Sequence, residues 1–198
     1  MDAAATDRTD MSPQLGHDER FRLLYESHLD DLKAYCLRRL GRDEAEDALA
    51  EIFSVAWRKL EKVPAGNEAR LWLYGVARNV VRNSMRSARR RARLGNRVSG
   101  FIYPPRPGPA ETTMTRSEHA DVLVALGKLR PGDQELLRLH AWEELSRSEI
   151  ARVLDISIAA VDMRLHRAIA RMSVALDALA GEARSDSTRR AEDGGGRL

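Results

Sequence analysis

The side chains best suited to chemistry in this sequence are arginines gathered in a segment without acidic residues. Between Ala69 and Ala110 the chain carries ten arginines and no aspartate or glutamate, although its formal net charge is only +3. Acidic residues concentrate elsewhere, notably between Asp43 and Glu51. This separation of charge favours one surface that binds a polyanion and another that binds a basic protein.

Aromatic and amide side chains precede the arginine run Arg86–Arg97 on the same predicted helix. They are Trp72, Tyr74, Asn79 and Asn83. Aromatic rings stack on unpaired bases, amides read base edges, and arginines hold the phosphate backbone. The combination favours a strand-separated nucleic acid over a closed duplex. The alternative is a solvated basic stretch, with Trp72 in the protein core.

A second nucleic-acid signal is a pair of helices predicted at Glu149–Leu154 and Ile158–Met172. Ala151 is small enough for a close helix crossing, Asp155 tolerates a left-handed turn, and Val161 can anchor the second helix. This spacing predicts a helix-turn-helix whose second helix enters the major groove; an ordinary helical hairpin is the alternative. The residues expected to cap or line that second helix are Ser157, Ala159, Ala160, Asp162, Met163, Arg164, His166 and Arg167.

No residue pattern indicates catalysis, a metal or a cofactor. The sequence has no Gly-rich phosphate loop, no metal-ligand spacing among its five histidines, and no arguable nucleophile triad. Cys36 is the only cysteine and falls on an apolar stripe, so we expect a buried, inert thiol. An acidic N-terminus and the lack of a long apolar run predict a cytoplasmic protein without signal peptide or membrane span.

Composition and periodicity predict an all-α protein of two domains. Asp43 and Glu46 have the spacing of a capping box, Gly41 is expected to close the preceding helix, and Asp133 is expected to cap a helix after Pro131. The predicted division is a disordered tail at 1–18, a helical domain at 19–94, a flexible Pro-rich linker at 95–117, a second helical domain at 118–180, and a disordered tail at 181–198.

Two stretches resemble conserved regions of sigma-70-type sigma factors. "DEAEDALAEIFSVAWRKL" (Asp43–Leu60) and "ARLWLYGVARNVVRN" (Ala69–Asn83) are similar to region 2, and Leu126–Met172 is similar to region 4. Regions 1 and 3 have no counterpart, which points to the minimal extracytoplasmic-function (ECF) subfamily. The resemblance implies a region 2 bundle of three to four helices and a region 4 helix-turn-helix domain.

The resemblance also implies a role for each matching position. Polymerase core binding is implied for Asp47, Leu49, Ala50, Glu51, Phe53, Ser54, Trp57, Arg58 and Leu60. Minus-10 DNA binding is implied for Lys62, Arg70, Trp72, Arg78, Asn79, Arg82, Asn83, Arg86, Arg89 and Arg90. Minus-35 recognition is implied for the helix-turn-helix from Glu149 to Ala168.

The partners implied are the β′ and β subunits of RNA polymerase core, promoter DNA in duplex and melted form, and an anti-sigma factor. The chain would be nucleoid-associated when in holoenzyme. Two positions depart from the family pattern. Asp155 stands where Gly is common, and Asp162, expected to face DNA, stands where a basic residue is common.

Two other interpretations of the sequence stay open at this point. The first is a stand-alone helix-turn-helix regulator that binds duplex DNA without polymerase. The segment Trp72–Asn79 beside an acidic helix argues against it. The second is an RNA-processing enzyme that uses the basic groove, against which stands the lack of any acid–base or metal set.

Overall fold

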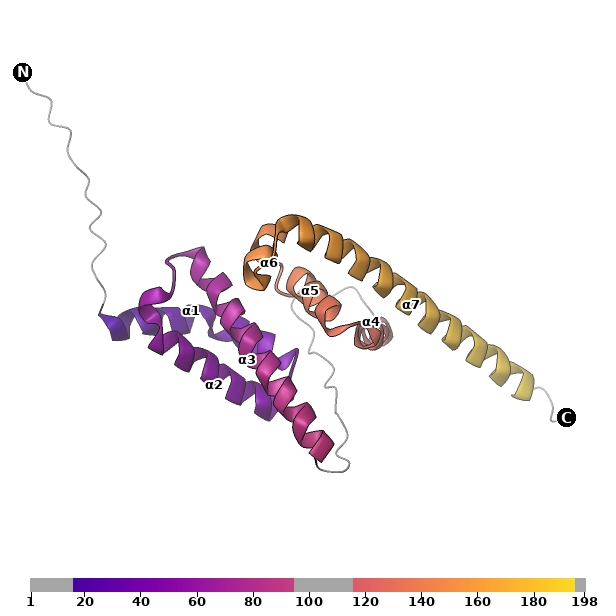
Figure 1. Ribbon diagram of the computed structural model, residues 1–198. Coiled ribbons are helices and arrows are strands. Elements are labelled where there is room, and N and C mark those ends of the chain that lie inside the picture. The colour runs from indigo at the N-terminus through magenta and orange to yellow at the C-terminus, as the bar shows by residue number, and fades with distance from the viewer. Residues whose placement is uncertain (1–15, 95–115, 195–198) are drawn as a thin grey trace, which may run out of the picture.

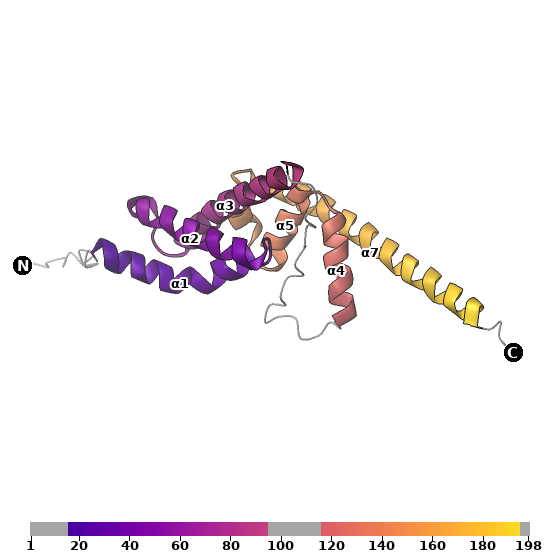
Figure 2. The same cartoon turned by 90° about the horizontal axis from the view of Figure 1, so that it is seen from below.

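The computed structural model describes residues 16–94 and 116–194, and every regular element in those ranges is a helix. Two groups of helices, α1–α3 and α4–α7, lie side by side in both views (Figures 1 and 2). We call them the N-terminal and C-terminal domains. The prediction of an all-α protein with two helical domains is confirmed. The predicted linker, apart from residues 116 and 117, which are helical, and most of the predicted N-terminal tail lie outside the described residues.

Three helices form the N-terminal domain: α1 (His17–Leu37), α2 (Arg42–Arg58) and α3 (Asn67–Leu94), with a short 3-10 turn η1 (Leu60–Lys62) before α3. Each helix turns an apolar stripe, spaced by three and four residues, toward the other two. From α2 this stripe contributes Ala45, Ala48, Ile52, Phe53 and Ala56 to the core. The opposite side of α2 remains in water, which leaves its acidic side chains available to a partner.

Four helices form the C-terminal domain: α4 (Arg116–Lys128), α5 (Pro131–Ala141), α6 (Arg147–Leu154) and α7 (Ile158–Gly194). The long helix α7 contacts each of the other three, and its C-terminal half projects away from the body (Figure 1). The core of this domain includes Leu136, Leu139, Ile150, Val161 and Leu165, all nearly inaccessible to solvent. This packing fixes α6 against the first turns of α7.

Three local predictions are wrong. Gly41 has φ −62° and begins α2 by accepting a hydrogen bond from the Ala45 backbone N–H (2.8 Å), so Asp43 and Glu46 form no cap. Helix α5 begins at Pro131, whose fixed φ suits a first helical position. Asp133 therefore lies inside α5, where it forms an ion pair with Arg171 of α7 (2.6 Å).

Helix α7 also extends further than the sequence predicted. It continues through Gly181 to Gly194. The prediction of a disordered tail is therefore wrong for residues 181–194. A glycine inside a helix costs only about 1 kcal/mol relative to alanine. Ala, Arg and Glu, which recur after Gly181, are among the better helix formers and favour continuation of the helix.

None of the helices in the described ranges combines the length and the apolar character needed to cross a membrane. The sole thiol, on Cys36, is fully buried, as predicted. Burial raises the pKa of this thiol to about 12. Cys36 therefore stays protonated and unreactive at neutral pH.

Candidate nucleic-acid interface

The connection between α6 and α7 has the geometry of a helix-turn-helix. Ser146 and Glu149 form a capping box at the start of α6: the Ser146 backbone N–H donates to Glu149 Oε2 (2.8 Å), and the Glu149 backbone N–H donates to Ser146 Oγ (3.3 Å). Asp155 ends α6 in the left-handed region (φ 54°, ψ 54°). Ser157 Oγ accepts from the Ala160 backbone N–H (3.2 Å) and caps α7. The predicted left-handed turn at Asp155 and the predicted Ser157 cap are both confirmed.

The first turns of α7 present a polar surface above a buried anchor. Val161 is fully buried, as predicted, whereas Arg164, His166 and Arg167 are exposed. The other expected contact residues are also accessible, with Ala160 half-buried: Ser157, Ala159, Asp162 and Met163. This helix therefore offers two cations and a row of small side chains that can approach the edges of bases.

Asp162 does not stand as an isolated negative charge on that surface. Its Oδ1 lies 2.8 Å from Nε of Arg147, at the start of α6. The ion pair ties the two helices of the motif together and partly neutralises the carboxylate. It therefore reduces the repulsion of phosphate that this departure from the family pattern would otherwise cause.

A single substitution tests the capping box. Replacing Ser146 with alanine removes the side-chain acceptor for the Glu149 backbone N–H, and we expect the free energy of unfolding to fall by about 1 kcal/mol. Hydrogen bonds from Ser146 also lower the pKa of Glu149, which shows that the cap holds its carboxylate form. Urea denaturation of the full chain measures the effect, with exposed Ser173→Ala on α7 as control. Equal stability of Ser146→Ala and wild type would contradict the role given to the cap.

Helix α3 carries the second candidate nucleic-acid surface. Asn79, Arg82 and Asn83 are exposed on one side of it, and Arg82 donates a hydrogen bond to Asn79 Oδ1 (3.1 Å). Trp72 is half-buried and lines a cleft of about 630 Å³ together with Arg78 and Asn79. Further along the same helix the arginine cluster is exposed at Arg86, Arg89, Arg90 and Arg91. Amide, indole and guanidinium groups therefore do gather on this part of α3.

Two residues expected on this surface are engaged elsewhere. Tyr74 is only 2% exposed and packs against Tyr35 of α1, with ring centroids 5.4 Å apart, so it is a core residue and not a platform for bases. Arg70 is half-buried; it donates to the backbone oxygen of Glu143 (3.0 Å) and lies 3.4 Å from Asp31. Arg70 therefore contributes to the contact between the domains. Lys62 of η1, a further residue expected on this surface, is exposed.

The acidic helix α2 presents a third surface. Asp47, Ala50, Glu51 and Ser54 are exposed at helical spacing, and Glu51 forms an ion pair with Arg58 (3.3 Å). The remaining residues expected to bind polymerase core differ in exposure: Trp57 is 40% exposed, Leu49 is half-buried, and Phe53 and Leu60 are buried. Phe53 and Leu60 therefore support this surface from the core and do not form part of it.

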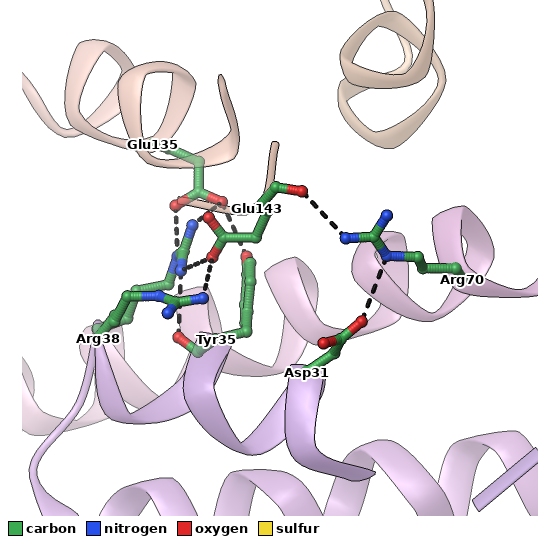
Figure 3. A network of polar contacts seen from close by, with 7 residues as sticks. Asp31, Tyr35, Arg38, Arg70, Glu135 and Glu143 are labelled. Atoms are coloured by element: carbon green, nitrogen blue, oxygen red, sulfur yellow. Dashed lines mark hydrogen bonds and ion pairs between the residues drawn. The ribbon is translucent and has the colours of Figure 1, made fainter. Parts of the chain in front are cut away.

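A polar network between the two domains was not predicted from the sequence. It joins Tyr35, Arg38 and Arg39 of the N-terminal domain to Glu135 and Glu143 of the C-terminal domain (Figure 3). We call these five residues the interdomain seam. The one signal in the sequence is that Arg39 and Glu143, both charged, fall at positions that the helical period of the neighbouring apolar residues would assign to the core.

Comparison with known proteins identifies both domains. Residues 24–91 match the family model of sigma-70 region 2, and residues 119–172 match that of sigma-70, region 4. RNA polymerase sigma factor CnrH of Cupriavidus metallidurans is 33% identical over 142 residues, which are 68% of this chain and 74% of CnrH. ECF RNA polymerase sigma factor SigL of Mycobacterium tuberculosis is 32% identical over 161 residues, 80% of this chain and 89% of SigL.

Solved structures agree with this assignment. The structure of CnrH in complex with the cytosolic domain of CnrY has a TM-score of 0.57 and 30% identity, and the match covers 80% of this chain and 88% of that one. The sigma factor RpoE of Bartonella quintana, solved with the anti-sigma factor NepR, has the same fold, with a TM-score of 0.63 at 24% identity over 79% of this chain and 96% of that one. The chain therefore belongs to the sigma-70 family, within the ECF RNA polymerase sigma factors.

Proposed function

We propose that this sigma factor binds RNA polymerase core, directs it to specific promoters and promotes melting of the DNA for transcription initiation. The observation that carries the proposal is the presence, on two domains of one ECF chain, of two exposed surfaces with different chemistry. The recognition helix α7 suits a duplex, and the basic, aromatic and amide face of α3 suits separated strands. The chemistry of RNA synthesis belongs to the polymerase, so this chain acts as a cytoplasmic binding factor and not as an enzyme.

Each of the three surfaces, on α2, α3 and α7, has its own binding partner. The exposed acidic face of α2 binds the β′ subunit, with the β subunit completing the contact with core. The face of α3 around Asn79 captures a base flipped out of the minus-10 element. Flipping a base costs a few kcal/mol of unstacking, which favourable contacts between the base and the cleft must offset. Arg164 and Arg167 of α7 contact the minus-35 element as duplex. Neither DNA surface alone needs to bind tightly, because attachment to polymerase raises the effective concentration of both.

An anti-sigma factor is the remaining partner. Support comes from the relatives: CnrH was solved with the cytosolic domain of CnrY, and RpoE with the anti-sigma factor NepR. Such a protein would bind this chain while it is not engaged with polymerase.

Run-off transcription with purified polymerase core and a library of genomic fragments tests the proposal. We expect the full chain to form a complex with core and to start RNA chains at a defined subset of fragments. A stand-alone regulator would instead bind duplex DNA equally well without core. Failure to associate with core, or initiation no better than with core alone, would contradict the proposed function.

Asn79 provides the sharpest test of the melting surface. Asn79→Ala removes an exposed amide at the mouth of the cleft, and loss of one base contact of about 1–3 kcal/mol corresponds to roughly a tenfold to hundredfold loss of open complex. Permanganate reactivity of unpaired thymines in the holoenzyme complex measures opening, and a mobility-shift assay in the cold measures the closed complex.

We expect the closed complex to form almost normally with Asn79→Ala, because its contacts are made mainly by other residues. Ser27→Ala, at an exposed position on α1, is the control and should leave both steps unchanged. Normal permanganate reactivity with Asn79→Ala would remove Asn79 from the melting surface.

A further inference from the structure

Arginines occupy only one side of the recognition helix α7. Arg164, Arg167 and Arg171 fall within about 60° of one another around the helix axis, at 3.6 residues per turn. The opposite side carries Asp162 and, over the same length of helix, neither lysine nor arginine. Buried Val161 lies between the two sides, so both of them flank the surface that faces away from the domain. The helix by itself therefore presents cations on one flank only.

A helix in the major groove meets phosphates on both flanks. The groove of B-DNA is about 12 Å wide, and a sugar–phosphate backbone runs along each of its edges. On the flank that lacks arginine, α7 offers no cation to the second strand, and the carboxylate of Asp162 would repel that strand. The groups around Asp162 therefore decide whether this flank attracts or repels DNA.

Arg147 brings a cation from α6 to this flank. Its Nε lies 2.8 Å from Asp162 Oδ1, and the two side chains are 62% and 51% exposed. Within residues 16–94 and 116–194 no hydrogen bond engages the Nη1 and Nη2 atoms of Arg147, so these donors are available to a ligand. A guanidinium binds phosphate through two parallel N–H donors. The ion pair thus presents a phosphate-binding group where α7 alone has an anion.

The start of α6 directs Arg147 toward α7. The carboxylate nearest to Arg147 in the sequence belongs to Glu149, and it is occupied by the capping box. Glu149 Oε2 accepts from the backbone N–H and from the hydroxyl of Ser146 (2.8 and 2.6 Å). The same box fixes the backbone from which the Arg147 side chain extends. Asp162 is therefore the carboxylate that holds this guanidinium.

We propose that Asp162 positions Arg147 to bind a phosphate on the strand opposite the one that Arg164 and Arg167 approach. This inference rests on the proposed function, because it takes α7 as the helix that enters the minus-35 groove. Asp162 is then a positioning residue, and an acidic side chain beside the DNA strengthens binding. The ion pair favours the contact because an arginine that is already ordered loses less conformational freedom on binding.

The salt dependence of holoenzyme binding tests the phosphate contact of Arg147. On the library fragment that gives the most initiation, Arg147→Ala should lower affinity about eightfold at about 0.1 M salt and make the slope of log affinity against log salt shallower by about 0.9. Arg147→Lys keeps the positive charge and should retain most of the slope. A loss that depends on one base pair of the minus-35 element, with an unchanged slope, would indicate a base contact and overturn the phosphate contact.

The sign of the effect of Asp162→Asn tests the positioning role. In the wild-type chain we expect this change to weaken holoenzyme binding about threefold, because Arg147 loses its partner. In the Arg147→Ala background the same change should strengthen binding, because it removes an unpaired carboxylate from the DNA side of the motif. If Asp162 only repelled phosphate, Asp162→Asn would strengthen binding in both backgrounds, and the positioning role would be wrong.

A second ion pair of the same domain is the matched control. Arg171 of α7 and Asp133 of α5 also join two helices, with 2.6 Å between Nη1 and Oδ2. Arg171→Ala and Asp133→Asn, singly and together, should leave the affinity and the salt slope unchanged. Urea denaturation of each variant measures stability, to which an exposed ion pair contributes little. A loss of stability in Arg147→Ala with an unchanged salt slope would reduce the Arg147–Asp162 pair to a structural contact and overturn the proposal.

Wild-type holoenzyme separates failure of this inference from failure of the proposed function. If the wild-type chain starts RNA with core, and both Arg147→Ala and Asp162→Asn match it in affinity and salt slope, only the role of the ion pair is wrong. If the wild-type chain does not associate with core or does not start RNA, the proposed function is wrong and this inference falls with it.

Discussion

Replacing Arg164 and Arg167 together with alanine should reduce initiation at promoters that depend on a minus-35 element on the order of 100-fold. Both side chains are exposed on the recognition helix, above the buried anchor Val161. Each contact of an arginine with a base edge or phosphate contributes about 1–3 kcal/mol, so loss of two contacts accounts for this factor. Run-off transcription on the library fragment that gives the most initiation measures this loss, and binding of the holoenzyme to the same fragment measures the loss of affinity.

The salt dependence of holoenzyme binding distinguishes the kind of contact. If both arginines contact phosphates, the slope of log affinity against log salt should become shallower by about 0.9 for each one lost. The control combines Arg22→Ala with Arg171→Ala, two exposed arginines already paired with carboxylates of the protein. Unchanged initiation by the Arg164/Arg167 variant would exclude this face of α7 from promoter recognition.

The sequence predicts the helix-turn-helix well because its geometry depends on short-range interactions. The Ser146–Glu149 box and the Ser157 cap each join residues three positions apart. The left-handed conformation of Asp155 concerns a single residue. Val161 could be assigned to the core because the helical period alone places it there. Family resemblance then assigns the function of the motif, which a helical hairpin of the same period would not share.

The predictions about site residues that failed depend on partners far away in the sequence. Tyr74 has the chemistry of a base-stacking residue, but Tyr35 of another helix packs against its ring. The pair Arg39–Glu143 joins residues 104 positions apart, so no local pattern shows that these two side chains meet. Likewise, Arg70 has the right type and place for DNA, but it donates a hydrogen bond to the backbone oxygen of Glu143, 73 positions away.

Reversing the charge of Asp47 and Glu51 together should weaken association with polymerase core at least 100-fold. Both carboxylates are exposed on α2, one helical turn apart, beside Ala50 and Ser54. Lysine at these positions would meet the basic partner that the acidic face is expected to bind, and like charges in contact cost several kcal/mol. Glu51→Lys would in addition face Arg58, its present ion-pair partner. Titration of labelled core with Asp47→Lys/Glu51→Lys and with wild type measures the affinity.

The chain offers a closely matched control on α1. Glu26 and Asp30 are also exposed acidic residues four positions apart, so Glu26→Lys/Asp30→Lys makes the same change in net charge at the same helical spacing. If general electrostatics governed association, both double variants would lose affinity equally. Loss confined to the α2 variant places the polymerase contact on α2. Full affinity of that variant would show that core binds elsewhere, because no interface could accept four units of reversed charge at its centre without a measurable cost.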